Sequence, residues 1–500
     1  MASDAPDPSA HVDYDKRWLI LAVLSLGFLM IILDATVINV ALPDAQQALG
    51  FSDNERQWVV TAYSLAFGST LLLGGKISDI IGRKRTFLIG LTGFAIVSGI
   101  GGASQSFGML VGARALQGLF GALLAPSALS LLTTTFTDPA ERGKAFAVWG
   151  AVAGSGASLG LLLGGVLTQL IDWRAVLEIN LIIAAIVGAG ALAWLRNTKP
   201  EAQPKIDWPG TVTVTVGLFG LVYGLSRIET TNSWTDTQAV VSLIAAVVLL
   251  ISFGWIESRV KEPLLPIRVL ATRYRGASLL AIGLSAITLF GAFLFLTFYM
   301  QRNLGYDPIK TGVAFLPLTV LVVISASLST TKLSRIPPRF LVTAGMLLGA
   351  ASMLYLTRLG VSATYAVDIL PMEIGLGAGL GLIFGPAINY ATLNLTEDDA
   401  GVGSALVNTN QQVGGAVGTA LLSTIAATAT SSFISSHAAG ASAASRAAEV
   451  AQATVHGYTT AFAWSAGFFA LGAIIAFFLY PRGVPREEKE LTGEPEPAAA

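Results

Sequence analysis

Long apolar segments recur along the whole chain and are separated by short polar stretches. The first runs from Trp18 to Val40, the last runs from Tyr458 to Tyr480, and there are fourteen in all. Roughly 20 residues of α-helix cross a bilayer core about 30 Å thick, and a helix satisfies its own backbone hydrogen bonds in lipid. The pattern therefore predicts an all-α integral membrane protein with fourteen transmembrane helices.

The spacing of these segments groups the predicted helices as six, two and six. The first six are expected near residues 18–40, 57–75, 86–104, 108–133, 143–170 and 175–195. The middle pair is expected near 209–226 and 238–257. The last six are expected near 277–300, 309–331, 338–358, 365–395, 402–430 and 458–480. A short surface helix at Ala443–Ala453 is predicted to precede the final one.

Two charged linkers that contain proline, at 196–208 and 257–275, flank the middle pair. The sequence therefore predicts five consecutive parts. These are an N-terminal tail at 1–17, a six-helix half at 18–195, linkers with an inserted helix pair at 196–275, a second six-helix half at 276–480, and a disordered tail at 481–500. The last part is short of apolar residues, which is typical of disorder.

Basic residues are distributed unevenly between the two predicted sides of the membrane. With an even number of helices both termini share a side, and that side carries 22 of the 30 Lys and Arg residues against seven on the other. Cytoplasmic segments of membrane proteins are enriched in these residues. We therefore expect a multi-pass protein of the cell (inner or plasma) membrane with both termini in the cytoplasm.

The composition argues against several other classes of protein. Of the 500 residues only 12% are charged and the net charge is −1, whereas soluble chains carry about 25% charged residues and nucleic-acid-binding domains are basic. Cysteine is absent and the three histidines lie outside the apolar segments, so neither thiol chemistry nor a metal site is expected. Neither a phosphate-binding loop nor a catalytic triad occurs, so we predict no enzyme activity and no cofactor.

Four local patterns narrow the class further. The loop after the second helix reads GKISDIIGRKR at Gly75–Arg85, and the first helix ends in LDATVINVALP at Leu33–Pro43. The fourth helix contains RALQG at Arg114–Gly118, and the fifth contains regularly spaced glycines. Together with the six-two-six layout, these patterns resemble the major facilitator superfamily, and more narrowly its fourteen-helix drug:proton antiporters. The resemblance covers all fourteen helices and implies a major facilitator fold with a cavity between two halves.

Asp34 and Arg114 are ionisable residues within predicted membrane helices, where such groups are costly and indicate function. At a rise of about 1.5 Å per residue both lie at nearly the same depth, so they can pair or compete for one proton. The resemblance implies that Asp34 is the acidic residue of the helix 1 motif, and that Arg114 is the arginine implicated in proton coupling. A static ion pair that only orders two helices is the alternative.

Glu373 is a further acidic residue near the middle of the membrane, roughly 13 Å from the outer end of its predicted helix. It matches no motif of the family. We expect it either to carry a second proton or to bind a cationic substrate, with a hydrogen bond to a neighbouring helix as the alternative. Glu178 and Asp368 lie nearer the outer boundary and are expected to reach water.

Asp79, Gly82 and Arg83 form a predicted cytoplasmic gate. Gly82 permits the tight turn between two membrane helices, and Asp79 can accept hydrogen bonds at the N-terminus of another helix. The resemblance implies that this is the thirteenth predicted helix, with Arg83 bridging to Asp138 or Glu141. This contact would hold the cytoplasmic side closed. The alternative is a basic loop that only follows the charge bias.

The glycines of the fifth helix, Gly156, Gly160, Gly164 and Gly165, form a predicted helix-packing motif. Small residues allow membrane helices to approach closely. The motif resembles the antiporter sequence GxxxGPxxGG, but Leu161 replaces its proline, so the kink that proline introduces is lost. A gating role and simple packing are both compatible with this pattern.

Polar and aromatic side chains in several helices are expected to line a substrate cavity. They are Asn39, Tyr63, Gln117, Phe290, Phe298, Asn408 and Gln412. Asn408 and Gln412 share one helix face, although helix packing is the alternative role for both.

The predicted function is proton-coupled efflux of small amphipathic or cationic compounds, such as drugs and antibiotics, by alternating access. Asp34 is the expected proton carrier and Arg114 modulates its protonation. The expected partners are a small-molecule substrate, protons and membrane lipids, and the protein is expected to be a monomer. An exporter dedicated to a single metabolite or lipid is the first alternative, and a membrane sensor that does not transport is the second.

Overall fold

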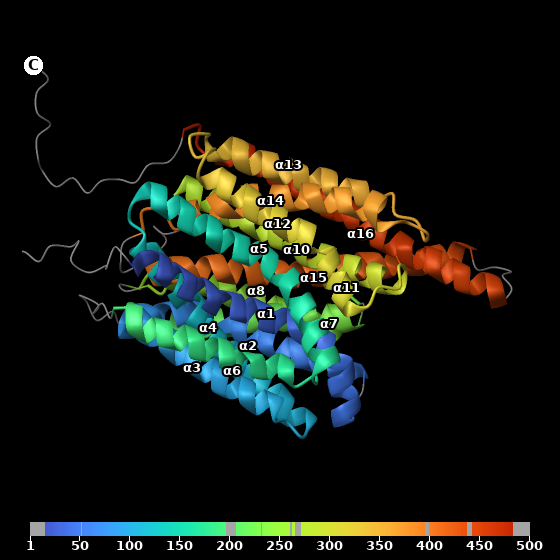
Figure 1. The fold of residues 1–500 in the computed structure, drawn as a ribbon, viewed down its shortest axis with the longest axis horizontal. Coiled ribbons are helices and arrows are strands. Elements are labelled where there is room, and N and C mark those ends of the chain that lie inside the picture. The colour runs from blue at the N-terminus through green and yellow to red at the C-terminus, as the bar shows by residue number, and fades with distance from the viewer. Residues whose placement is uncertain are drawn as a thin grey trace, which may run out of the picture.

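The computed structural model is helical throughout the residues that it describes (Figure 1). These residues are 16–51, 53–196, 207–231, 233–260, 263–265, 272–395, 400–437 and 443–483. Within them the structure contains no β-strand. Most of the two predicted tails therefore lies outside the described residues.

The first six helices are α1 (Arg17–Leu49), α2 (Asp53–Ile81), α3 (Arg83–Gly102), α4 (Phe107–Thr135), α5 (Pro139–Leu170) and α6 (Ala175–Trp194). The middle pair is α7 (Trp208–Thr231) and α8 (Thr237–Glu257). The remaining elements are α10 (Arg273–Arg302), α11 (Pro308–Ala314), α12 (Leu316–Thr330), α13 (Pro338–Leu356), η3 (Tyr365–Ile369), α14 (Leu370–Ala391), α15 (Ala400–His437) and α16 (Ala443–Leu479).

Thirteen helical segments among the described residues are long and apolar enough to cross a membrane, with α11 and α12 forming one of them and η3 and α14 another. The 32-residue α5 contains a shorter apolar stretch at Leu159–Leu170 and is long enough to be a fourteenth. The predicted all-α membrane fold is therefore confirmed, and the predicted count of fourteen membrane helices is roughly consistent with the structure.

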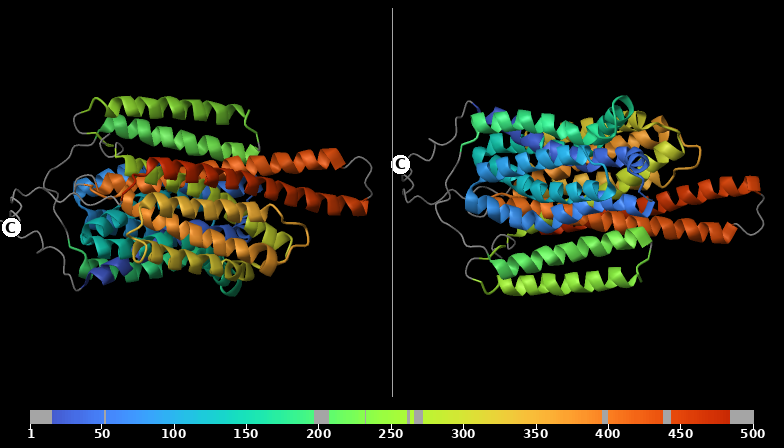
Figure 2. Two further views of the ribbon diagram at one scale, coloured as in Figure 1. Left: turned by 90° about the horizontal axis from the view of Figure 1, so that it is seen from above. Right: turned by 90° about the horizontal axis from the view of Figure 1, so that it is seen from below.

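The helices pack as two groups with the middle pair at one side. Helices α1 to α6 pack against one another, as do α10 and α12 to α16. The two groups meet where α5 contacts α11, α12 and α14, and where α15 contacts α2 and α4. Figure 2 shows α7 and α8 lying beside this bundle, where α7 packs against α2 and α15.

One predicted helix is interrupted in the structure. The segment expected as a single helix near 309–331 consists of α11 and α12, which are separated at Phe315. Pro317, which lies in the first turn of α12, has no N–H to donate and cannot continue a regular helix. The next span also begins irregularly, because the π-helical η3 precedes α14, whose first turn contains Pro371.

Helices α15 and α16 are longer than a membrane crossing requires. Their 38 and 37 residues correspond to roughly 57 Å and 56 Å of helix, and both project beyond the rest of the bundle at one end (Figure 2). The residues Ala443–Ala453, predicted as a short surface helix, are helical, but they form the first part of α16 and not a helix of their own. An alanine-rich segment favours helix and continues directly into the apolar span.

The two ends of the bundle are named here by what they contain. The terminal end is where α1 begins at Arg17 and α16 ends at Leu479. The hairpin end is the opposite end, where α15 ends at His437 and α16 begins at Ala443. The loop between α2 and α3 lies at the terminal end, and α11 lies towards the hairpin end.

Candidate functional site

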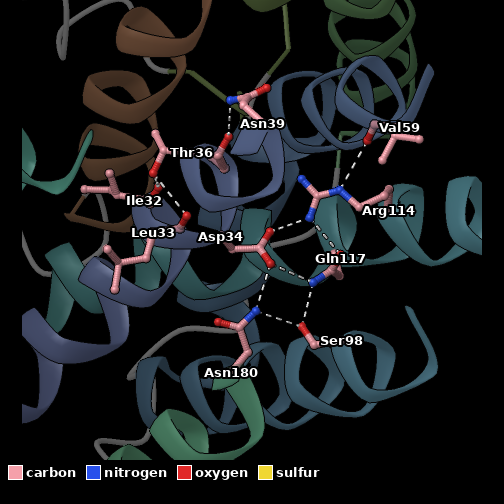
Figure 3. Close-up of polar contacts among 11 residues, drawn as sticks. Ile32, Leu33, Asp34, Thr36, Asn39, Val59, Ser98, Arg114, Gln117 and Asn180 are labelled. Atoms are coloured by element: carbon pink, nitrogen blue, oxygen red, sulfur yellow. Dashed lines mark hydrogen bonds and ion pairs between the residues drawn. The ribbon is translucent and has the colours of Figure 1, made fainter. Parts of the chain in front are cut away.

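A buried polar network lies among the first six helices (Figure 3). Asp34 comes from α1, Ser98 from α3, Arg114 and Gln117 from α4, and Asn180 from α6. Asp34 is 2% exposed and Arg114 is 0% exposed. Each of these residues stands in an otherwise apolar or small-residue stretch, so the helix faces that carry them turn towards one another and away from lipid.

The carboxylate of Asp34 accepts hydrogen bonds from three side chains. Arg114 Nη1 donates to Oδ2 at 2.5 Å, which closes a buried ion pair. Gln117 Nε2 and Asn180 Nδ2 donate to Oδ1 at 3.0 Å and 2.8 Å. An ionised carboxylate only accepts hydrogen bonds, and bonds to a guanidinium are among the strongest. This arrangement matches an ionised Asp34, whose Oδ2 accepts one hydrogen bond and keeps a second acceptor position where a proton can bind.

Arg114 is held on several sides. Its Nε donates to the Val59 carbonyl at 3.2 Å, and its Nη1 donates to Gln117 Oε1 at 2.9 Å. The guanidinium carbon lies 4.4 Å from the centre of the Tyr63 ring, a distance at which a cation is attracted to an aromatic face. Among the described residues Nη2 has no hydrogen-bond partner, so its two N–H groups remain available to another group.

Two members of the network, Ser98 and Asn180, were not predicted as site residues. Ser98 Oγ accepts hydrogen bonds from Gln117 Nε2 at 2.5 Å and from Asn180 Nδ2 at 3.2 Å. The sequence feature that indicates a role for Asn180 is that it is a lone asparagine in the apolar stretch of α6. Tyr63 and Gln117, which were predicted to line a substrate cavity, lie against Arg114 and are buried.

The glycines of α5 bring this helix against the helix that carries Asp34. All four predicted glycines lie in α5 and are buried. A Cβ atom added at Gly156, Gly160 or Gly164 would crowd, respectively, Ile32, Thr36 or Val37 of α1. The close approach of α5 to the Asp34 site therefore depends on these three glycines having no side chain.

The predicted gate residues lie together at the terminal end. Gly82 has a φ of +95° between α2 and α3, a conformation that favours glycine. Asp79 and Arg83 are buried. The predicted partner of Asp79 is the start of α15 near Ala400, where the side chains and the preceding residues 396–399 lie outside the described part of the chain. Glu141 forms an ion pair with Arg17 at 2.5 Å.

A contact between the two helix groups at the terminal end was not predicted from the sequence. Arg142, in the first turn of α5, donates from Nε to Asn389 Oδ1 at 3.2 Å and from Nη2 to the Thr392 carbonyl at 2.9 Å. Thr392 follows the last residue of α14, where the helix dipole favours a cation. The two groups are therefore linked at this end by an arginine that contacts a helix C-terminus.

The other predicted cavity residues are dispersed. Asn39 is exposed on α1, and Asn408 is buried and donates to the Ser404 carbonyl of its own helix at 2.9 Å. Gln412 is half-buried, and Phe298 lies beneath Arg302, with 5.2 Å between the guanidinium carbon and the ring centre. The side chain of Phe290 is outside the described part. None of these residues lines the open cavity of about 410 Å³ at the hairpin end.

Glu373 lies in the first turn of α14, in the second helix group, and is 0% exposed. Its Oε2 is 3.0 Å from the hydroxyl oxygen of Tyr365 in η3. The residue is thus removed from Asp34 and lies towards the hairpin end. In the described part of the chain no cluster of three side chains suited to a metal ion is found.

The fold and the buried ion pair define a polytopic membrane protein with an ionisable site inside its helices. The family model of the Major Facilitator Superfamily matches residues 24–419. The chain therefore belongs to the Major Facilitator Superfamily, whose members are membrane transporters.

Curated relatives and a solved structure agree with this assignment. The chain is 44% identical over 481 residues to the puromycin resistance protein pur8 of Streptomyces alboniger, which covers 96% of this chain and 93% of that protein. It is 34% identical over 429 residues to the tetracenomycin C resistance and export protein of Streptomyces glaucescens, covering 85% and 79%. It is 30% identical over 421 residues to the multidrug resistance protein Stp of Mycobacterium tuberculosis, covering 84% and 78%. The human organic anion transporter MFSD10 shares the fold, with a TM-score of 0.60, 14% identity, and coverage of 92% and 99%.

Proposed function

We propose that this protein exports small amphipathic or cationic compounds, antibiotics among them, in exchange for protons. The relatives described above are named for resistance to such compounds or for their export. The observation that carries the proton part of the proposal is the buried ion pair between Asp34 and Arg114. An ionisable pair inside a membrane helix bundle costs free energy, and such pairs mark functional sites.

In the proposed cycle Asp34 takes up a proton and loses its charge. The neutral carboxyl no longer holds Arg114 by charge, so its hydrogen bonds with its three donors weaken. These donors come from α4 and α6, so the change acts on two helix contacts of α1 at once. Movement of these helices relative to one another would couple protonation to alternating access.

The proposed orientation places the terminal end in the cytoplasm. With this assignment the cytoplasmic segments carry 22 Lys and Arg residues and the external segments carry seven, as the positive-inside rule expects. The proposed cytoplasmic gate consists of Asp79, Gly82 and Arg83, and the bridge from Arg142 to α14 supports a closed terminal end in this conformation. Substrate would then leave on the hairpin side. Opening the terminal end requires that Arg142 release the Thr392 carbonyl.

The first compound to test is puromycin, an amphipathic amine, since the relative at 44% identity is named for resistance to it. Two of the three relatives are named for a single compound and the third for many. An exporter dedicated to one compound is therefore the second candidate function. A panel of puromycin, tetracenomycin C and a fluorescent lipophilic cation separates the two.

The test uses purified protein in liposomes with an acidic interior, and it measures accumulation of each compound. We expect accumulation that requires the pH gradient and that is abolished in Asp34→Asn. Asp44→Asn is the matched control, because Asp44 is exposed on the same helix; it should transport normally. Gel filtration of each variant checks its folding. Accumulation that ignores the gradient, or that Asp34→Asn retains, would refute proton exchange through Asp34.

A further inference from the structure

Among the described residues, no positively charged side chain pairs with Glu373. It is fully buried, and Oε1 has no hydrogen-bond partner among the described residues. The neighbouring spans of α5 (145–170), α12 and α13 (340–354) contain no ionisable side chain. The only described hydrogen-bond partner of its carboxyl group is the hydroxyl of Tyr365.

The other titratable groups near this end are engaged elsewhere. Asp368 of η3 accepts hydrogen bonds from the backbone N–H and the hydroxyl of Thr364, at 2.6 Å and 3.3 Å. Lys310 of α11 lies over the ring of Tyr306, which in turn neighbours the Tyr365 ring. The arginines at the hairpin ends of the adjacent helices, Arg302 of α10 and Arg358 after α13, lie on the rings of Phe298 and Tyr355.

The Tyr365 hydroxyl has two contacts but only one hydrogen to donate. The Tyr365 hydroxyl oxygen lies 2.7 Å from the Ala314 carbonyl oxygen and 3.0 Å from Glu373 Oε2. A hydroxyl carries one hydrogen, and a backbone carbonyl can only accept. Tyr365 can therefore donate to only one of the two, and when it donates to Ala314, at the shorter distance, the hydrogen in the other contact has to come from a protonated Glu373. If Glu373 were ionised and Tyr365 donated to it, the short contact between Tyr365 and the Ala314 carbonyl would lack a hydrogen. If Tyr365 donated to Ala314 instead, the buried carboxylate would be left without a donor. Both situations are unfavourable.

The Ala314 carbonyl lies where the two helix groups meet. Ala314 is the last residue of α11, and carbonyls at a helix C-terminus lack partners within the helix. Gly312, two residues earlier, faces α5, since an added Cβ would lie 2.6 Å from Leu162 Cα. The hydrogen bond from Tyr365 therefore holds the segment of the second group that presses against α5.

We propose that Glu373 is a second proton-binding site, occupied in this conformation, whose proton controls the attachment of α11. When the proton leaves to water, the Tyr365 hydroxyl keeps its own hydrogen and turns it from the Ala314 carbonyl to the Glu373 carboxylate. The Ala314 carbonyl then loses its partner and α11 is released from η3. Proton binding by Glu373 stands independently of transport, whereas its part in the exchange cycle rests on the proposed function.

Infrared difference spectroscopy of the protein in lipid membranes tests the protonation directly. Spectra taken across a pH series should contain a carbonyl band of a protonated carboxyl group that is lost in Glu373→Gln. Asp368→Asn is the matched acid-to-amide control on the adjacent element and should keep the band. Tyr365→Phe should keep the band but shift it, because the acceptor of the carboxyl hydrogen is gone. If wild-type and Glu373→Gln spectra coincide at every pH, Glu373 does not carry the proton.

A distance measurement tests the attachment of α11. The chain has no cysteine, so pairs of spin labels can be placed at Val313 of α11 and Leu170 of α5, which are 48% and 74% exposed. The distance distribution should change with pH in the wild-type background and stay in its acidic form in Glu373→Gln. If the distance distribution still changes with pH in Glu373→Gln, the proton on Glu373 does not control the attachment of α11. Failure of transport in liposomes would refute the proposed function and would leave both of these results unchanged.

Discussion

Asp34 and Glu373, two of the buried acids of this protein, have opposite surroundings. Asp34 accepts three hydrogen bonds, one of them from a guanidinium. Glu373 has a single hydroxyl neighbour and an oxygen without a partner among the described residues. The first set of contacts suits a carboxylate and the second suits a neutral carboxyl, because buried charge is tolerated only where it is paired and hydrogen-bonded. The side chains are chemically alike, so their charge states follow from the partners that the fold supplies.

Helix α5 lies between the two regions. Three of its glycines contact α1, which carries Asp34, whereas Leu162 contacts Gly312 of α11, which the Tyr365 hydroxyl ties to Glu373. A displacement of either neighbour is therefore transmitted to α5 through tight packing. This arrangement offers a physical connection between the two acids without any direct contact between them.

The largest expected effect comes from removing the cation of the first site. Arg114→Met keeps the volume of the side chain but leaves a buried carboxylate without its partner, which costs about 3–5 kcal/mol. Thermal unfolding of the purified protein should show a large loss of stability, and the double variant with Asp34→Asn should recover most of it. Arg85→Met is the control, because Arg85 is exposed. Equal stability of Arg114→Met and Arg85→Met would show that Asp34 is not ionised.

A smaller effect is expected from disturbing α5 on each of its two faces. Gly160→Ala would press on Thr36 and Gly312→Ala on Leu162, and such overpacking typically costs about 1–3 kcal/mol. Gly112→Ala is the matched control, since nothing lies within 4 Å of its added Cβ and alanine favours helix.

Unfolding temperatures of the three glycine variants measure this cost. Infrared spectra separate the two faces, because Gly312→Ala should alter the Glu373 band and Gly160→Ala should leave it in place. A Gly160→Ala protein as stable as Gly112→Ala would mean that α1 and α5 are not in close contact.

The sequence predicted the first region well and the second poorly, for physical reasons. Asp34 and Arg114 are charges inside apolar helices at matching depth, so helix geometry alone suggests that they can meet. Ser98 and Asn180 are short polar residues of a kind that occurs throughout membrane helices, and their role depends on how α3 and α6 rotate. Only the packed structure fixes that rotation.

Glu373 was identified as unusual, but its partner was not. Periodicity predicted a regular helix near 365–395, whereas the structure begins with the π-helical η3 before Pro371. The break at Phe315 places the Ala314 carbonyl at a helix end. Both irregularities arise where proline removes a backbone donor, and the site forms where the two irregular segments meet. A sequence reading can locate the prolines, but it does not say which broken segments pack together.

The smallest expected effect gives the sharpest comparison, because it uses the same acid-to-amide change in both regions. Glu373→Gln replaces a neutral carboxyl by a neutral amide whose N–H can donate to the Tyr365 hydroxyl, so its stability should change by less than about 1 kcal/mol. Asp34→Asn leaves Arg114 without a counter-charge and should cost several times more. Unfolding midpoints at neutral pH, with Asp44→Asn as the exposed control, measure both. A clear gain in stability for Glu373→Gln would mean that Glu373 is ionised, since the substitution would then remove a buried charge that has no cationic partner among the described residues.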